Sequence, residues 1–183
     1  EVFRCVVVVH DSSNAMVSEE TEVTVVNSDP YFLEGLSAST SEAYVGDTIS
    51  CSAQAYDLQD GALSLEFSWT NQHGDILSST STLELGVDNS DPDDVLTCSV
   101  QTSDSSGVGL SDSVDVVVKN SKPVLEGVSI VPDPFYIDST TYSCLTGASS
   151  DADGDTITFT NEWFVNGSPM QVGHQFSVGE VLS

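Results

Sequence analysis

The sequence predicts an all-β protein built from tandem sandwich domains of about 93 residues each. Three observations lead to this prediction. The chain repeats itself at a spacing of 93 residues, its apolar segments are short and rich in β-branched residues, and no long segment has the apolar periodicity of a helix. Clusters of Gly, Asp, Asn and Ser separate the apolar segments, as turns between strands require.

The repeat is seen best where residues 5–30 are placed over residues 98–123 without a gap. Eleven of these 26 positions are identical, and they include the cysteine, an Asp-Ser-Ser triplet and a closing Asn-Ser-x-Pro. The rest of the chain repeats in the same register. Cys51 and Cys144 are 93 residues apart, and Trp69 and Trp163 are 94 residues apart. Matches that share one register indicate a tandem array.

Each unit contains short segments with the composition of strands. They are rich in Val, Thr and aromatic residues and alternate in part between apolar and polar side chains. In the central unit these segments are residues 48–53, 63–69, 95–100 and 114–118. A sandwich of two sheets is the expected arrangement for a unit of this length.

The charge of the chain excludes whole classes of partner. Its 29 acidic and three basic side chains give a formal net charge of −26. A protein without a basic surface cannot neutralise phosphates, so we expect no nucleic-acid partner, and we also expect no direct membrane insertion. Such a charge repels itself within the folded chain. Salt relieves the repulsion, because the Debye length falls to roughly 3–5 Å at seawater-like ionic strength.

The four cysteines, Cys5, Cys51, Cys98 and Cys144, are widely spaced and form no Cys-x-x-Cys pair. Structural zinc normally requires closely spaced ligand pairs, so the spacing disfavours a zinc site. An even number of distant cysteines favours disulfides and therefore an extracellular or cell-surface location. Buried free thiols in a cytosolic protein are the alternative.

The order Cys51, Trp69, Cys98 resembles the immunoglobulin fold, in which a tryptophan packs on a disulfide between two sheets. More narrowly, the chain resembles the tandem immunoglobulin-like repeats of large prokaryotic extracellular surface proteins. This resemblance implies a disulfide between Cys51 and Cys98 within one domain, with Trp69 in its core. Trp163 then holds the same core position in the next unit. Leu96 stands where antibody-type domains carry a tyrosine two residues before the second cysteine, so the domain is a divergent one.

The repeat divides the chain into one complete domain and two parts of domains. We expect residues 29–121 to form the complete domain. Residues 1–28 match the last two strands of a domain, and residues 122–183 match its first strands. The two flanking parts are therefore complementary, and the resemblance implies that Cys5 and Cys144 pair between neighbouring units.

Three arrangements satisfy this complementarity. The chain is a segment of a longer covalent array, or a subunit that receives two strands from the next subunit, or a molecule whose two ends close on each other. In the first two arrangements the partners are flanking repeats of the same polypeptide or copies of the chain, joined head to tail.

Two acidic turns are candidate calcium sites. Asp151, Asp153 and Asp155 alternate around a glycine, and alternate carboxylates in a tight turn can converge on one hard cation. The corresponding turn of the complete domain carries Asp57 and Asp60, with fewer carboxylates. An ordinary turn on an acidic surface is the alternative for both.

No motif of a catalytic site is present, and we expect no enzymatic activity and no cofactor other than calcium. Trp69 and Trp163 are expected in the core, with sugar-binding platforms as the alternative. The sequence therefore favours a structural repeat of an extracellular filament, stalk or adhesin shaft. The second reading is a cell-surface module that recognises a carbohydrate or protein through the loops of its sandwich.

Overall fold

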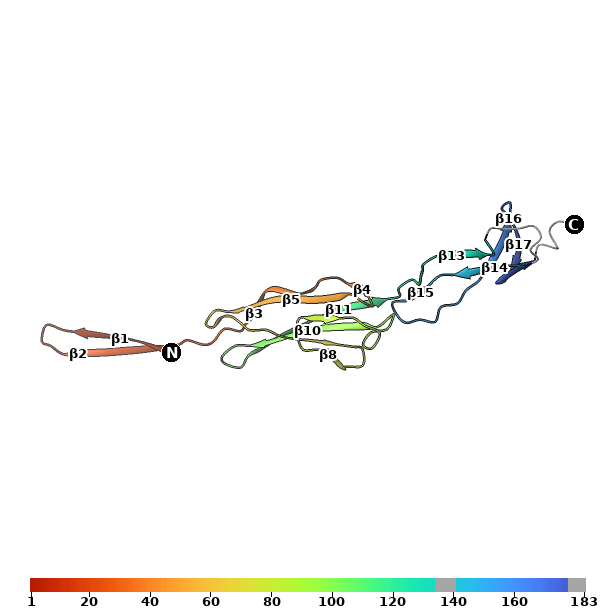
Figure 1. Cartoon of the computed structure of the whole chain (residues 1–183). Helices are drawn as coiled ribbons and strands as arrows, with labels where there is room; N and C mark the ends of the chain where they lie inside the picture. Colours follow the sequence, from red (N-terminus) through yellow and green to blue (C-terminus); the bar gives the residue numbers. More distant parts are fainter. Residues whose placement is uncertain (134–140, 178–183) are drawn as a thin grey trace.

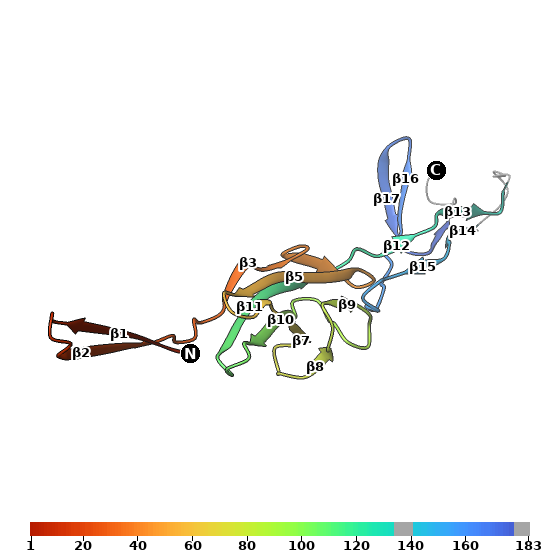
Figure 2. The same cartoon turned by 90° about the vertical axis from the view of Figure 1, so that its left-hand side faces the viewer.

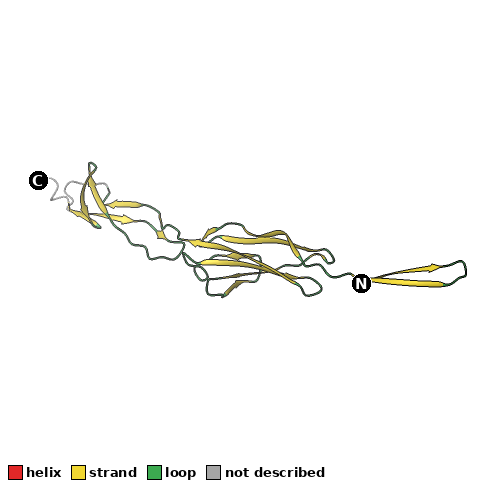
Figure 3. Cartoon of the chain, turned by 180° about the vertical axis from the view of Figure 1, so that it is seen from behind, coloured by secondary structure: helices red, strands yellow, loops and turns green. Residues whose placement is uncertain are grey.

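The computed structural model describes residues 1–133 and 141–177, which form strands and turns without a helix. The prediction of an all-β fold is therefore confirmed. Figure 1 shows an N-terminal hairpin, a central two-layered unit and a group of C-terminal sheets in chain order, and Figure 3 shows the strands of each part. No helix among the described residues is long and apolar enough to span a membrane. Residues 134–140 and 178–183, which belong to the predicted C-terminal part, lie outside the described residues.

The N-terminal hairpin consists of β1 (Val2–His10) and β2 (Met16–Thr24), and every residue of both strands is exposed. Its valine-rich first strand favours the extended backbone. The turn is fixed by Asp11, whose Oδ1 accepts hydrogen bonds from the amides of Ser13 and Ala15 at 2.8 and 2.9 Å. Asn14 has a φ of 63°, in the left-handed region that asparagine tolerates.

The central unit consists of two sheets. The first is a five-stranded sheet with the order β4 (Glu42–Tyr44), β11 (Gly109–Lys119), β10 (Val95–Ser103), β7 (Glu66–Thr70), β8 (Ile76–Ser78). In the second, β5 (Thr48–Asp57) pairs with β3 (Tyr31–Ala38), β6 (Gly61–Ala62) and β9 (Thr82–Glu84). Strand β4 runs parallel to β11, whereas the other pairs are antiparallel. Figure 1 shows β3 and β5 on one side of the unit and β10 and β8 on the other.

The core of the central unit lies between these two sheets. Cys51 on β5 and Cys98 on β10 are at disulfide distance, with their Cα atoms 6.7 Å apart. Trp69 is fully buried and belongs to the same cluster, as the sequence predicts for a core residue. The other buried members of the cluster are Ala43, Ile49, Leu83, Leu85, Leu96, Val116 and Val118.

The described residues of the C-terminal part form three small sheets. Their strands are β12 (Val124–Leu125) with β15 (Ser149–Ser150), β13 (Val128–Val131) with β14 (Thr141–Thr146) and β18 (Gln175–Ser177), and β16 (Glu162–Val165) with β17 (Ser168–Val172). Figure 2 shows that β16 and β17 project from the rest of this part. Tyr142, Trp163 and Phe176 form a small buried cluster, with Cys144 partly buried against it. Trp163 is therefore also a core residue.

Strand pairing recurs in the same register along the chain. The nine residue pairs of β1 and β2 run from Val2 with Thr24 to His10 with Met16, and those of β10 and β11 are the positions 93 residues later. Similarly, Tyr142 pairs with Phe176 in the C-terminal part, and Ile49 pairs with Leu83 in the central unit. The residues that align in sequence therefore occupy the same positions in the sheets.

We expect the Cys51–Cys98 bond to contribute a large share of the stability of the central unit. A bridge across a sequence separation of 47 residues restricts the unfolded chain, and its loss costs roughly 2–5 kcal/mol. Replacing both cysteines by alanine should lower the free energy of unfolding by this amount. Urea titration followed by Trp69 fluorescence in a Trp163→Phe background measures it. The variant Cys5→Ser/Cys144→Ser is the control and should keep the parent midpoint; equal midpoints for all three proteins would contradict the prediction.

Candidate functional site

The first linker, between β2 and β3, is held by two turns of the central unit. The amide and hydroxyl of Ser28 both donate to Oε1 of Gln59, which lies in the turn after β5. At the turn between β10 and β11, Nδ2 of Asn27 donates to Oδ2 of Asp104 at 2.7 Å and to Oγ of Ser106 at 3.1 Å. The linker is thus fixed by hydrogen bonds to residues far away in the sequence.

Asp104 organises the turn between β10 and β11. It is 6% exposed, and its Oδ1 accepts from the amides of Ser106 and Val108 and from the hydroxyl of Ser106. Burial alone would raise the pKa of this carboxyl. The hydrogen bonds from Ser106, Val108 and Asn27 favour the charged form more strongly, and together they hold the pKa of Asp104 below its ordinary value.

Asp57 performs a similar task at the turn after β5. Its side chain is fully buried, and Oδ1 accepts from the amides of Gln59 and Asp60 at 2.7 and 2.9 Å. Asp60 in turn accepts the amide of Ser105 at 2.8 Å, so the two turns are bonded to each other. In this geometry Asp57 and Asp60 bind backbone amides, and Oδ2 of Asp57 also accepts the hydroxyl of Ser28 at 3.4 Å.

The second linker, between β11 and β12, is held in the same way by an acidic turn. The amide and hydroxyl of Ser121 donate to the two carboxylate oxygens of Asp153. Ser121 follows Ser28 by 93 residues, and Asp153 follows Gln59 by 94 residues. The amide oxygen of Gln59 and the carboxylate of Asp153 therefore hold equivalent serines, and the hydroxyl of Ser28 also donates to Oδ2 of Asp57 at 3.4 Å.

The acidic turn brings three carboxylates together. One ligand oxygen from each of Asp151, Asp153 and Asp155 lies within 4.8 Å of the others, and no other such group of three occurs among the residues described. Oδ1 of Asp151 accepts the amides of Asp153 and Asp155 at 2.9 and 3.4 Å. The carboxylate of Asp155 is exposed and accepts none of the hydrogen bonds found in the described chain. Three close oxygens of this kind suit a hard cation such as calcium.

The two remaining cysteines occur in the two flanking parts. Cys5 is exposed on β1, and Cys144 is partly buried on β14. Figure 1 places the hairpin and the C-terminal sheets at opposite ends of the chain, so these cysteines are not brought together within it. Trp69 and Trp163 are buried, and neither indole presents an open face to a sugar.

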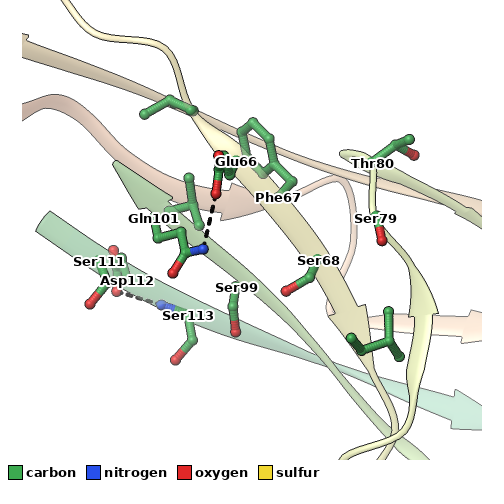
Figure 4. A pocket seen from close by; sticks show the side chains of 13 residues that line it. Glu66, Phe67, Ser68, Ser79, Thr80, Ser99, Gln101, Ser111, Asp112 and Ser113 are labelled. Carbon is green, nitrogen blue, oxygen red and sulfur yellow. Dashed lines mark hydrogen bonds between the residues drawn. The ribbon is translucent and has the colours of Figure 1, made fainter. Parts of the chain in front are cut away.

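A hollow of about 1020 Å³ lies on the outer face of the five-stranded sheet (Figure 4). Most of its side chains are polar, and Phe67 is its one aromatic residue. Nε2 of Gln101 donates to Oε2 of Glu66 at 3.1 Å across this face. The hollow therefore offers hydroxyls and the carboxylates of Glu66 and Asp112, without the stacked aromatic rings of a typical sugar site.

Sequence reasoning identified the acidic turn but missed the contacts that hold the linkers. Their signal was present, since Asn-Ser-x-Pro and Asp-Ser-Ser are among the identical features of the repeat. These motifs supply Asn27, Ser28, Asp104 and Ser106 to one junction. Comparison of the chain with known family models and with curated proteins yields no match.

The lowered pKa of Asp104 predicts an acid-sensitive junction. The charged carboxylate stabilises the fold above the pKa of the unfolded group, about 3.9, and this stabilisation is lost as the pH falls through the lower pKa of the folded state. Asp104→Asn should therefore be less stable than the parent at pH 6, with a difference that shrinks between about pH 5 and pH 2. Urea titrations at a series of pH values measure this difference.

The control for this experiment is Asp112→Asn. The exposed carboxylate of Asp112 accepts only the amide of its neighbour Ser113, so this variant should follow the parent at every pH. A constant difference between Asp104→Asn and the parent from pH 6 to pH 2 would contradict the role assigned to Asp104.

Proposed function

We propose that the chain is a structural repeat of an extracellular filament, stalk or adhesin shaft, built from immunoglobulin-like domains in a linear array. Its partners are copies of itself or flanking repeats of the same polypeptide, joined head to tail. Its role is mechanical, because each unit adds length and each junction resists bending. Residues 29–121 form one domain of this array, and residues 1–28 and 122–183 are parts of its neighbours.

The observation that carries the proposal is the recurrence of the junction contacts. Ser28 and Ser121 each use an amide and a hydroxyl to bind one side chain of the following unit. A proline follows each serine after one residue and restricts the backbone further. A linker that is both short and hydrogen-bonded suits a stiff array better than a flexible chain of domains.

The domain type is supported by the pattern of strands. A disulfide joins β5 to β10 in the facing sheet, and the indole of Trp69 packs in the same cluster. Strands β11, β10, β7 and β8 are neighbours in one sheet, and β3, β5 and β9 pair in the other. This division between sheets is typical of immunoglobulin-like sandwiches.

Calcium at the acidic turn belongs to the same proposal. Asp151, Asp153 and Asp155 would supply its carboxylate oxygens, and a bound cation would offset their mutual repulsion beside the second linker. Because Asp153 also binds Ser121, the cation would strengthen a contact between two units.

A cell-surface binding module is the second candidate function, and the hollow beside Glu66 and Gln101 favours it. A ligand with several hydroxyl groups would suit its polar side chains. The two functions predict different positions on a cell: a shaft is found along the length of an appendage, whereas a binding module is concentrated at its tip.

Immunogold electron microscopy tests the location. Antibodies raised against the purified chain should label cell-surface filaments or stalks along their length, since every repeat carries the epitope. Pre-absorption of the antibodies with the same chain is the control. Labelling confined to the cytoplasm would overturn the proposal, and labelling confined to the tips would favour the binding module.

Calcium titration tests the acidic turn. The chain should bind about one calcium ion with a dissociation constant on the order of 0.1–1 mM, the range of extracellular modules. Asp155→Ala should weaken binding at least about tenfold, because it removes one of only three carboxylates and leaves the Ser121 contact intact. Isothermal titration calorimetry measures both.

Glu84→Ala is the matched control, since it removes an exposed carboxylate from β9. It should bind calcium like the parent. If the parent shows no saturable binding, or if both variants weaken it equally, calcium is not part of the function and the array proposal is unaffected.

A further inference from the structure

We propose that hairpin β1–β2 of one copy of this chain docks on the C-terminal sheets of a second copy and completes its sandwich, with a disulfide between Cys5 of the first copy and Cys144 of the second. This inference rests on the proposed head-to-tail array and names its partner. The central unit is the template for this docking. Its residues, 93 positions away in the sequence, indicate the two docking surfaces, their register and the contact at the junction.

One face of the hairpin is apolar and uncovered. Phe3, Cys5 and Val7 alternate along β1 and share a face, and Val23 lies opposite Phe3 on β2. Phe3, Val7 and Val23 are 58, 56 and 63% exposed. The other face carries the ion pair of Arg4 with Glu20. A two-stranded hairpin with an open apolar face is a surface that normally packs against another sheet.

The central unit shows what this face packs against. The positions 93 residues after Phe3, Cys5, Val7 and Val23 are Leu96, Cys98, Val100 and Val116. These four side chains are at most 1% exposed. Leu96, Cys98 and Val116 belong to the same buried cluster as Trp69 and the β5 residues Ile49 and Cys51. The two hairpins therefore have the same strand register, but the apolar face is buried in β10–β11 and exposed in β1–β2.

The C-terminal sheets present the matching surface. In the central unit β7 pairs with β8 on one side and with β10 on the other. Among the described residues, β16 pairs only with β17, so its second edge has no strand partner. Tyr142, Trp163 and Phe176 form the beginning of a core beside that edge, and Cys144 is next to them. Adding two strands to this edge produces a four-stranded sheet that faces β14.

The register of the docked hairpin follows directly. Cys98 pairs with Trp69 in the central unit, so Cys5 is expected opposite Trp163 of the second copy. Cys51 donates its amide to the carbonyl of Ser81, and Cys144 donates to that of His174 at the position 93 residues later. Cys144 thus has the backbone setting of Cys51, the cysteine that is bonded to Cys98.

A hydrogen bond at the junction adds specificity. In the central unit the linker residue Asn27 donates to Oδ2 of Asp104. The corresponding pair is Asn120 of the second copy and Asp11 of the docked hairpin. Asp11 already binds the amides of its own turn through Oδ1, as Asp104 does, which leaves Oδ2 in position for Asn120.

Formation of the bond requires an oxidant, and a disulfide such as oxidised glutathione supplies it. The Cys5 and Cys144 thiols together lose two protons and two electrons and form one S–S bond. The S–S bond of oxidised glutathione breaks, and two molecules of reduced glutathione are released. Because each copy carries a net charge of −26, docking should be stronger at 0.5 M than at 0.05 M NaCl.

The test mixes two single variants of the full chain, Cys5→Ser and Cys144→Ser, in a glutathione redox buffer at 0.5 M NaCl. Only one productive pair remains in this mixture, Cys5 of one variant with Cys144 of the other. Non-reducing electrophoresis should therefore show a covalent dimer in the mixture and a ladder of multimers for the parent. Peptide mapping after cleavage at acidic residues should identify the Cys5–Cys144 linkage.

A second measurement does not depend on the thiols. In the Cys5→Ser/Cys144→Ser background, Val7→Asp places a charge on the docking face, and Val6→Asp places it on the opposite face. Sedimentation velocity should show association in the background protein. Val7→Asp should reduce the association constant at least about tenfold, because a buried unpaired charge is costly, and Val6→Asp should leave it within about threefold. Both residues are exposed in the free hairpin, so neither variant disturbs the fold of the single chain.

Several results would overturn the inference. These are a chain that stays monomeric at high salt, a Cys5–Cys144 bond within one monomer, Cys5–Cys5 or Cys144–Cys144 dimers alone, and equal effects of Val6→Asp and Val7→Asp. Labelling of filaments with a monomeric chain would reject strand exchange and keep the array. A dimer without any extracellular labelling would keep the exchange and reject the proposed function.

Discussion

The structure depends on the packing of hairpin β10–β11 against β5 and Trp69. This hairpin supplies Leu96, Cys98, Val116 and Val118, four of the ten buried residues in the central cluster. The bond from Cys98 to Cys51 fixes the two sheets at the point where these side chains meet. Among the described residues of the C-terminal sheets, the buried cluster consists of Tyr142, Trp163 and Phe176. Hairpin β10–β11 therefore supplies a large share of the core of the central unit.

The acidic surface sets the conditions under which such packing is stable. The whole chain has three basic side chains, so few carboxylates can form an ion pair with a basic residue. The two ion pairs of the described part are on the surface and join Arg4 to Glu20 and Lys119 to Glu42. Exposed pairs contribute at most about 1 kcal/mol each. Hydrogen bonds from backbone amides to Asp57 and Asp104 are the more effective way in which the fold accommodates acids. Dissolved salt or bound cations must screen the rest.

The sequence predicts much of the fold because the repeat can be read directly from it. The strands around Cys5, Cys51, Trp69 and Cys98 lie where the patterns predict them, and the close group of Asp151, Asp153 and Asp155 was visible as an alternating motif. Two features were missed. The three-residue strand β4 is too short to show a pattern, and its pairing with β11 depends on the tertiary fold. The bond from Asn27 to Asp104 spans 77 residues, and no local property of either residue identifies the other.

The two junctions differ in one chemical respect. Gln59 holds Ser28 with a neutral oxygen, whereas Asp153 holds Ser121 with a carboxylate that lies close to two others. The first junction also contains carboxylates, since Ser28 donates to Asp57 and Asn27 donates to Asp104, but both of these carboxylates accept hydrogen bonds from backbone amides. At the second, the carboxylates repel one another unless ions are near, and the repulsion acts on the side chain that holds the linker. In the proposed linear array, the second junction would therefore gain stiffness where ions are abundant.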